Sequence, residues 1–249
     1  MVTPARASIA RRGRRIARFL QDPLAIAQSA ATHPPAYGQA VMGLPAAALP
    51  ETSLAVALAA RSSARRTAMT GAITLEQVSA LLSLAARSNR VVPAPAAPDV
   101  NFHFRPYPSA GALYPCDIHI MAADVAGLAP GAWRYDALNH QLIADNASDD
   151  KPTSFDTCEI AAHGASPSCA IVIAGTLDRA TVKYGARGYR FAVLEAGHIS
   201  QNIVLAATAL SLPSLVYGSF CDTELERLLG LDGINEVVLS VILVGSGVA

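Results

Sequence analysis

The chain has 249 residues, of which 52% are hydrophobic and 15% are charged, so it can bury a sizeable core and is not expected to be disordered. The formal net charge is zero, but residues 21–249 hold all 19 acidic residues and only 13 of the 19 basic ones, which gives this body a formal charge of −6. An acidic body argues against a general nucleic-acid-binding protein, and the longest apolar stretch, Ile203 to Gly218, is too short and too interrupted by Pro213 to span a membrane.

Residues 1–50 are basic and rich in alanine and proline, and we expect them to form an extension ahead of a domain at 51–249. Arg11 to Leu20 favours a short basic helix, and the four prolines of residues 32–50 favour a linker. No secretory signal pattern follows the basic start. This extension is either a solvated tail or a segment that docks on an acidic surface, by contacts that salt would weaken. Its six arginines are Arg6, Arg11, Arg12, Arg14, Arg15 and Arg18.

The pattern of the body predicts an α+β fold. Thr74 and Gln77 form a capping box, which predicts a helix from Thr74, and the prolines at 93, 95 and 98 predict a loop after it. Because strands and helices then follow without regular βαβ alternation, we expect a sheet covered by helices. The further expected elements are strands at 117–122, 170–175, 214–217 and 236–244, a hairpin at 132–135 and 141–144, a long helix at 189–210 and a short helix at 223–229.

Three short segments carry candidate chemistry. Arg61-Ser-Ser-Ala-Arg65, if extended, presents two guanidinium groups and a hydroxyl on one face, which suits a phosphate monoester or a solvated basic surface. Pro108-Ser-Ala-Gly-Ala-Leu-Tyr-Pro115 is a loop whose glycine can bring backbone close to a planar ligand, or it is only a loop. In Lys183-Tyr184 a neighbouring ammonium lowers the cost of forming tyrosinate, so the two can act in proton transfer; the alternative is a surface turn.

The long helix carries Glu195, His198 and Asn202 on one face, and we interpret Glu195 as part of a self-satisfied polar network at a subunit interface. No histidine pair has the spacing of zinc ligands, so no metal site is predicted. The four cysteines, at 116, 158, 169 and 221, form no CxxC pair, and we expect buried free thiols in a reducing cytosol.

In this order, these segments resemble the SagB-type dehydrogenases, the azoline-oxidising branch of the nitroreductase superfamily. Gly131-Ala-Trp-Arg-Tyr-Asp136 and Glu195-Ala-Gly-His-Ile-Ser-Gln-Asn202 complete the resemblance, which covers about Arg61 to Gly245. It implies a central, mainly antiparallel sheet flanked by helices, an intertwined homodimer and two FMN sites at the subunit interface. It also implies oxidation of thiazoline or oxazoline rings to azoles in a ribosomally made precursor peptide, in the cytoplasm and with a cyclodehydratase complex as partner.

The resemblance assigns roles to individual residues. Lys183 and Tyr184 match a catalytic pair, with Tyr184 as the base. Arg61, Ser62, Ser63 and Arg65 would hold the phosphate and ribityl chain of FMN. The flavin ring would be lined by Pro108, Ser109, Ala110, Gly111 and Leu113 of the second subunit, and its other edge by Tyr217, Gly218 and Ser219. Many nitroreductases add a basic residue near the C-terminus, whereas the last basic residue here is Arg227; either Arg187 or Arg190 replaces it or fewer charges hold the phosphate.

Two alternatives to azoline oxidation stay open. The chain could be an NAD(P)H-dependent nitroreductase or quinone-type flavin oxidoreductase, or an enzyme of flavin fragmentation, although the Lys-Tyr pair is not needed there. It could also be a non-catalytic scaffold subunit of a peptide-modifying complex, in which the fold is kept and the flavin is lost.

Overall fold

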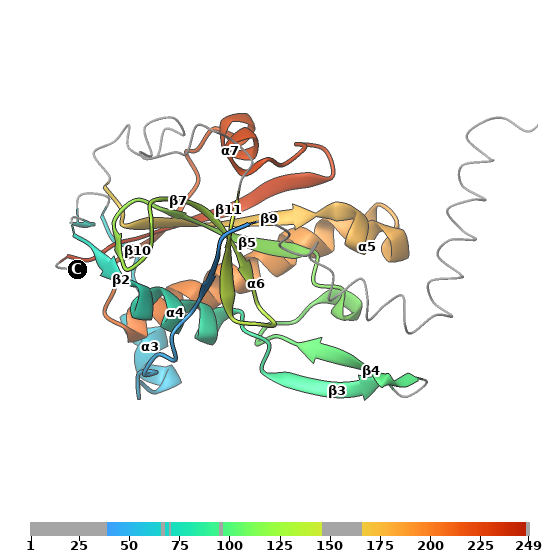
Figure 1. The fold of residues 1–249 in the computed structure, drawn as a ribbon, viewed down its shortest axis with the longest axis horizontal. Coiled ribbons are helices and arrows are strands. Elements are labelled where there is room, and N and C mark those ends of the chain that lie inside the picture. Colours follow the sequence, from blue (N-terminus) through green and yellow to red (C-terminus); the bar gives the residue numbers. More distant parts are fainter. Residues whose placement is uncertain (1–38, 66–67, 70, 95–96, 146–165, 248–249) are drawn as a thin grey trace, which may run out of the picture.

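The structure, a computed structural model, describes residues 39–65, 68–69, 71–94, 97–145 and 166–247. Its centre is a seven-stranded sheet in the order β1-β8-β7-β5-β9-β11-β10, in which every neighbouring pair is antiparallel (Figure 1). The strands are β1 (Val41–Gly43), β5 (Cys116–Ala122), β7 (Gly131–Asp136), β8 (Gln141–Ala144), β9 (Cys169–Thr176), β10 (Ser214–Tyr217) and β11 (Glu236–Val244).

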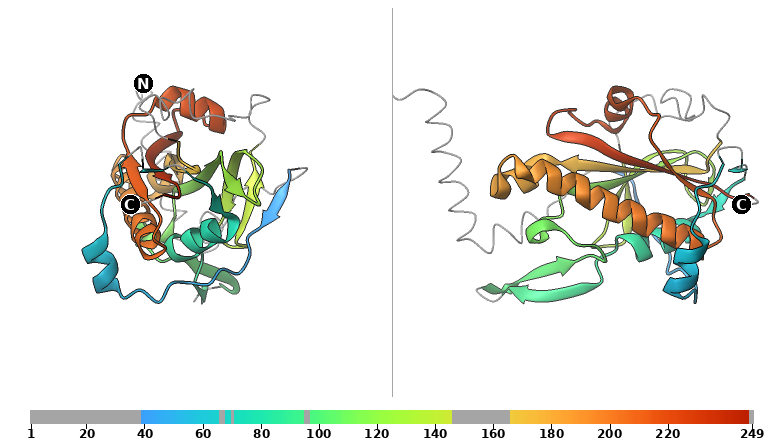
Figure 2. Two further views of the ribbon diagram at one scale, coloured as in Figure 1. Left: turned by 90° about the vertical axis from the view of Figure 1, so that its left-hand side faces the viewer. Right: turned by 180° about the vertical axis from the view of Figure 1, so that it is seen from behind.

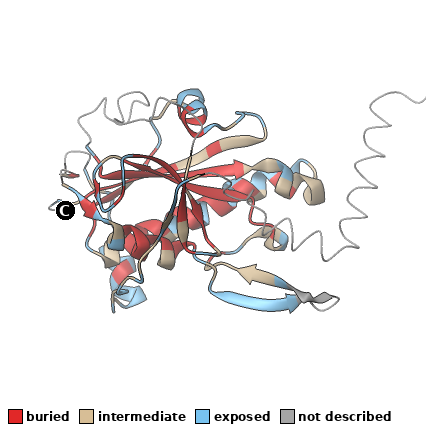
Figure 3. Cartoon of the chain, viewed as in Figure 1, coloured by how far each residue is buried: buried red, intermediate tan, exposed pale blue. Residues whose placement is uncertain are grey.

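Both faces of this sheet are covered, because side chains alternate between its two sides. Ile118 and Ile120 of β5 pack in one cluster with α4 (Leu75–Ala85) and α6 (Arg187–Ala209). Met121 packs in a second cluster with α7 (Asp222–Leu229) on the opposite face. The central strands are accordingly almost fully buried (Figure 3). The fold is thus the expected α+β arrangement of a mainly antiparallel sheet between helices.

Local signals explain where the helices under the sheet begin and end. The hydroxyl of Thr74 accepts a hydrogen bond from the backbone N–H of Gln77, and the Gln77 side chain accepts one from the N–H of Thr74, so the predicted capping box starts α4. α6 has 23 residues and spans the underside of the sheet from one end to the other (Figure 2). Its buried residues recur at helical spacing and include Ala192, Glu195, Ile199 and Ile203.

Two small sheets lie outside the central one. β2 (Ile73–Thr74) pairs in parallel with β6 (Val125–Ala126). β3 (Arg90–Ala94) and β4 (Ala97–Phe104) form an antiparallel hairpin that projects from the body (Figure 1). A 3-10 turn at Ala110–Ala112 follows β4, and the helices α3 (Leu54–Ala60) and α5 (Leu177–Tyr184) complete the described elements.

The structure corrects two sequence expectations. The proline-containing segment after α4 is the β3–β4 hairpin rather than a loop. Both strands of a two-stranded sheet are edge strands, and proline is tolerated there because an outward-facing position needs no backbone N–H for pairing. β1 pairs with β8 through Val41–Ile143 and Met42–Leu142, so part of the segment expected as a linker belongs to the sheet. The division into an extension and a domain stays a prediction, since the basic helix expected at Arg11–Leu20 lies outside the described residues. None of the described helices is long and apolar enough to cross a membrane.

Candidate functional site

The loop from Pro108 to Pro115 has an unusual backbone. Gly111 has a φ of 64°, and the flanking residues Ala112 and Tyr114 also have positive φ values, of 54° and 46°. The Ser109 hydroxyl accepts a hydrogen bond of 2.9 Å from the backbone N–H of Tyr114, which closes the loop on itself. Positive φ is costly for residues with a side chain, so this loop is held in a conformation that its surroundings must stabilise.

The side-chain ends of Lys183 and Tyr184 both lie next to Gly111 in this loop. A Cβ built on Gly111 would lie 2.6 Å from the Tyr184 Oη and 2.8 Å from the Lys183 Nζ. The two atoms are therefore no farther apart than the sum of those distances. The pair lies in the last turn of α5, and the C-cap residue Gly185 that follows has a φ of 58°. The ring of Phe191 meets the ring of Tyr184 edge to face at 4.9 Å and holds it in place.

The structure thus brings two of the predicted segments together within one chain. The absence of a side chain at Gly111 leaves room for the phenol and the ammonium above the loop. The Lys183 Nζ lies 5.3 Å from the centroid of the Tyr184 ring, within the range of a cation–π contact. An acid–base pair of this kind can exchange a proton with a ligand that lies against the loop.

A buried carboxyl lies beneath the same loop. Glu195 of α6 is 1% exposed, and its Oε1 accepts a hydrogen bond of 3.2 Å from the backbone N–H of Cys116. Its Oε2 has no hydrogen-bond partner among the described residues. Burial raises the pKa of Glu195 from 4.5 to about 7, which the nearby Ser109 hydroxyl and Cys116 N–H oppose only in part. The expectation that Glu195 lies at a subunit interface is wrong, because the carboxyl is enclosed by its own chain.

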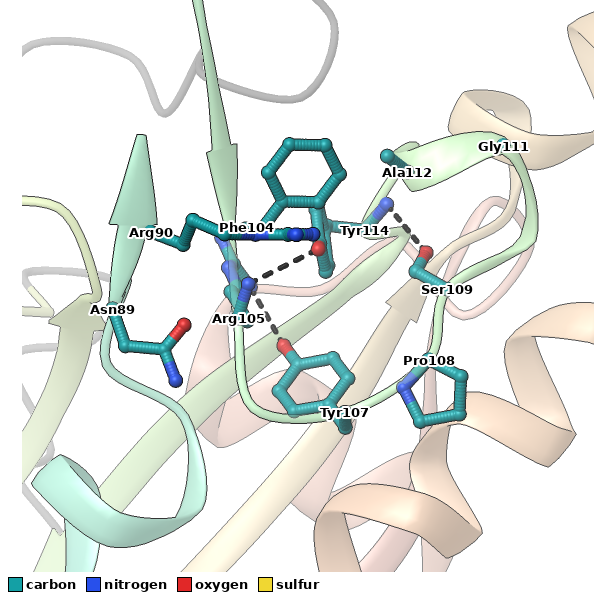
Figure 4. Close-up of a pocket in the computed structure, with 10 residues that line it drawn as sticks. All are labelled: Asn89, Arg90, Phe104, Arg105, Tyr107, Pro108, Ser109, Gly111, Ala112 and Tyr114. Carbon is teal, nitrogen blue, oxygen red and sulfur yellow. Dashed lines mark hydrogen bonds between the residues drawn. The ribbon is translucent and has the colours of Figure 1, made fainter. Parts of the chain in front are cut away.

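A cavity of about 790 Å³ opens between this loop and the β3–β4 hairpin (Figure 4). Arg105 lies at its base: its Nη1 donates to the Tyr107 hydroxyl at 2.9 Å, and its guanidinium carbon lies 4.8 Å from the centroid of the Tyr114 ring. Arg90 from β3 stacks over Phe104 at 4.3 Å. These residues were not among the predicted site residues, although an aromatic and cationic run leads into Pro108 in the sequence.

A second cavity, of about 620 Å³, contains most of the predicted phosphate-binding segment. Ser62, Ser63 and Arg65 line it, together with Thr208 and Ser211 at the C-terminal end of α6. Arg61 is exposed at the C-cap of α3 and does not line this cavity. Two hydroxyls and a guanidinium are donors that suit a phosphate and a polyol chain.

The two candidate regions lie at opposite ends of α6. Tyr184 packs on Phe191 near the start of the helix, whereas Thr208 lines the second cavity near its end. At 1.5 Å per residue, these helix positions are about 25 Å apart along the axis. One FMN molecule does not span this distance, so the structure does not bring the two regions together within a single chain.

The other predicted site residues have varied positions. The Leu113 side chain is fully buried, so only its backbone could contact a ligand, and the Tyr217 side chain is buried as well, whereas Gly218 and Ser219 are exposed after β10. Arg187 and Arg190 are exposed in the first turn of α6, far from the Ser62–Arg65 cavity of the same chain.

The described residues contain no cluster of three or more metal-ligating side chains. His198 is exposed on α6, while Asn202 donates to the carbonyls of Ala85 and Pro106 and so ties α6 to the segment that leads into the loop. Cys116 and Cys169 are buried free thiols, as expected, Cys221 is half-buried, and Cys158 lies outside the described residues.

A family model described as the nitroreductase family matches residues 58–246. The chain belongs to the nitroreductase family. MJ1384 of Methanocaldococcus jannaschii, which carries the name of a nitroreductase, is 33% identical to this chain over 129 residues. The match covers 51% of this chain and 64% of MJ1384. The microcin B17-processing protein McbC of Escherichia coli is 29% identical over 157 residues, or 61% of this chain and 57% of McbC. The matches thus span less than two thirds of either relative.

Solved structures share the fold. The E. coli microcin synthetase McbBCD complex, solved with truncated pro-MccB17 bound, matches with a TM-score of 0.62 and 24% identity over 75% of this chain and 69% of the matched chain. A nitroreductase from Exiguobacterium sibiricum, solved in complex with FMN, matches with a TM-score of 0.52 and 12% identity over 80% of this chain and 90% of the other. Structural neighbours in the family therefore bind FMN, and the expected nitroreductase-like fold is confirmed.

Proposed function

We propose that the chain is an FMN-dependent dehydrogenase that oxidises azoline rings to azoles in a ribosomally made peptide. The convergence of Lys183 and Tyr184 on Gly111 carries this proposal, because a plain nicotinamide-driven nitroreductase does not need a proton-transfer pair at that position. The likeness to McbC, a microcin B17-processing protein, supports a role in peptide modification.

The residues present fit FMN. Ser62, Ser63 and Arg65 offer hydroxyl and guanidinium donors for its phosphate and ribityl chain, and the Gly111 loop offers backbone groups beside the Lys183–Tyr184 pair for a planar ring to lie against. FMN, when bound, supplies the acceptor for the two electrons of the oxidation. Pro108, Ser109 and Ala110 are proposed to line the same ring, with Gly218 and Ser219 at its other edge.

In the proposed reaction, an azoline loses two hydrogens to become aromatic. Tyr184, as the phenolate that the neighbouring Lys183 ammonium stabilises, accepts the proton from the ring Cα at its Oη and becomes the neutral phenol. Gly111 and its neighbours position the ring against both atoms. Phe191 keeps the phenol oriented, so the proton acceptor is held in place before the substrate arrives.

A homodimer would complete the site. The two candidate regions of one chain are about 25 Å apart along α6, so a flavin held by Ser62–Arg65 of one copy would meet the Gly111 loop of a second copy. The outer face of α6 offers a surface for such a contact: Val193 and Leu194 are 43% and 53% exposed, and no atom lies within 4 Å of a Cβ built on Gly197.

The precursor peptide and a cyclodehydratase complex are the proposed partners. The likeness to the McbBCD complex, solved with truncated pro-MccB17 bound, supports this choice, although its identity of 24% shows the fold alone. The basic extension is proposed to dock on an acidic surface, which is either that of the partner enzyme or the acidic body of a second copy of this chain.

The test gives the FMN-loaded protein an azoline-containing peptide and, in parallel, NADPH with a nitroarene. The proposal expects each azoline ring to lose the mass of two hydrogen atoms, with oxygen as the final acceptor. Rapid consumption of NADPH with no mass change in the peptide would instead support a nitroreductase. A colourless protein that takes up no added FMN would support a scaffold subunit.

A further inference from the structure

The cavity between the β3–β4 hairpin and the Gly111 loop is positively charged. Arg90 and Arg105 line it, and none of the described residues that line it is acidic. Neither guanidinium forms an ion pair with a carboxylate in the part of the chain that the structure describes. Arginine with aromatic walls is a chemistry that recognises carboxylates and phosphates.

The Arg105 guanidinium is held in place by its neighbours and still has N–H donors for a ligand. Its Nη1 donates to the Tyr107 hydroxyl at 2.9 Å and to the Cys116 carbonyl at 3.5 Å, while its guanidinium rests on the ring of Tyr114. Its backbone N–H donates to the Tyr114 hydroxyl at 3.1 Å. A guanidinium has five N–H donors, so several remain for a ligand in the cavity.

Arg90 adds a second, more accessible charge. It lies directly opposite Phe104 in the hairpin register and stacks over that ring at 4.3 Å. The side chain is exposed, so it can turn towards a ligand at little cost. The two guanidiniums therefore approach the cavity from the hairpin and from its base (Figure 4).

The nearest acids, Asp117 and Glu195, act on the Arg105 charge but neutralise only part of the charge of the two guanidiniums. The oxygens of Asp117 are engaged by the Arg179 guanidinium at 2.8 Å and by the Thr176 hydroxyl at 3.1 Å. Burial raises the pKa of Glu195 to about 7, so this carboxyl carries only part of a negative charge at neutral pH. The cavity thus keeps a net positive potential that an anionic ligand group would complement.

The cavity is continuous with the proposed site of chemistry. Gly111, on which Lys183 and Tyr184 converge, lines the same cavity as the two arginines. A ligand whose reacting ring lies at Gly111 would therefore place its neighbouring group between the loop and the hairpin.

We propose that this cavity binds a carboxylate of the peptide substrate, on the residue next to the azoline ring. This inference rests on the proposed function and narrows the substrate class to peptides with an acidic residue beside the ring. A phosphate of a nicotinamide nucleotide has similar chemistry, and the experiment below separates the two sources.

The experiment compares matched azoline peptides that carry Glu or Gln beside the ring, with one pair for each side. The wild-type protein is expected to show a KM about tenfold lower for the Glu peptide of at least one pair, as a charge-assisted hydrogen bond would give. The Arg90→Gln protein should have the same KM for both members of that pair, and Arg90→Lys should restore part of the preference for the Glu peptide. Arg87→Gln is the matched control, because Arg87 is an exposed arginine close in sequence that does not line the cavity.

A binding measurement removes the dependence on turnover. The Kd of the fully oxidised azole peptides, measured by fluorescence anisotropy, should show the same Glu preference in the wild type and its loss in Arg90→Gln. An unchanged preference in Arg90→Gln, or no preference in the wild type, would overturn the inference while peptide oxidation itself continued. A loss of NADPH over NADH preference in Arg90→Gln, with the peptides unaffected, would assign the cavity to a nucleotide phosphate and also overturn it. Oxidation of none of the peptides would count against the proposed function instead.

Discussion

Gly111 has an unusual backbone conformation and lies next to the proposed catalytic pair. Its φ of 64° suits glycine, and its missing side chain gives room to Tyr184 Oη and Lys183 Nζ. Gly111→Ala should therefore displace both groups and lower the rate of azoline oxidation by at least about tenfold. Steady-state oxidation of an azoline peptide by the FMN-loaded variant measures the effect.

The matched control for that substitution is Gly127→Ala. Gly127 also has a positive φ, of 90°, but a Cβ there meets only the Leu75 side chain at an ordinary 3.5 Å. Both variants should lose roughly 1 kcal/mol of stability from the backbone conformation, and only Gly111→Ala should lose activity. Equal rates in the two variants would show that the space above Gly111 does not matter.

Glu195 should make stability depend on pH. Its pKa rises from 4.5 in the unfolded chain to about 7 in the folded one, so the folded state holds the proton more tightly. The stability that this proton provides is complete below about pH 4.5 and is lost as the pH rises through about 7. The free energy of unfolding of Glu195→Gln relative to wild type should therefore rise by on the order of 3 kcal/mol across this window.

Urea unfolding at fixed protein concentration measures this difference at several pH values. Glu224→Gln, which removes an exposed carboxyl on α7, is the control and should show a much smaller pH dependence. A difference between Glu195→Gln and wild type that stays constant with pH would contradict the assignment of this carboxyl.

At the scale of elements, α6 is proposed to form the contact between two copies. Leu194 is 53% exposed in the middle of its outer face. Leu194→Arg should place two charges against each other in a symmetric dimer, which would weaken the dimer and, with it, FMN retention. Light scattering and the flavin absorbance of the purified variant measure both effects.

Ile234→Arg is the matched control, because Ile234 is an even more exposed apolar residue, at 82%, in the loop between α7 and β11. It should leave both the dimer and the flavin unchanged. A monomeric Leu194→Arg protein that retains FMN would show that one chain forms the flavin site alone.

The sequence predicted the elements whose signals are local. α4 begins at its capping box, and β10 and β11 have the expected bounds, because a short apolar run between turn residues predicts a strand from local sequence. The β3–β4 hairpin was not predicted, because three prolines in this segment indicated a loop more strongly than its other residues indicated strands. β1 and α3 are short elements whose stability depends on packing rather than on their own sequence.

The site residues that could be predicted were those in segments that resemble the SagB-type dehydrogenases or have an unusual composition. Lys183 and Tyr184 stood out in a chain with two lysines, and the structure places both at the Gly111 loop. The role of Arg105 depends on Tyr107 and Tyr114 folding around it, and the burial of Glu195 depends on the loop above it. Such tertiary contacts leave no pattern along the chain.

At the scale of the whole molecule, the boundary of the folded unit is testable by truncation. β1 pairs with β8, and the Leu44 N–H donates to the His140 carbonyl at 3.1 Å. The chain without residues 1–50 should have a free energy of unfolding roughly 3 kcal/mol lower than the chain without residues 1–38, since the hydrogen bonds of β1 and Leu44 are lost. Chemical denaturation of the two truncated proteins checks this, and equal stabilities would show that β1 contributes nothing to the sheet.

The central claim is that Lys183 and Tyr184 carry out proton transfer in azoline oxidation. The most direct measurement is the single-turnover rate of oxidation of an azoline peptide by Tyr184→Phe and Lys183→Met, each shown by absorbance to be loaded with FMN. Tyr189→Phe, which alters an exposed tyrosine on α6, serves as the control. The account predicts that both site variants lose about 10²- to 10⁴-fold in rate while the control does not. Flavin-loaded Tyr184→Phe and Lys183→Met proteins that oxidise the peptide at the wild-type rate would contradict it.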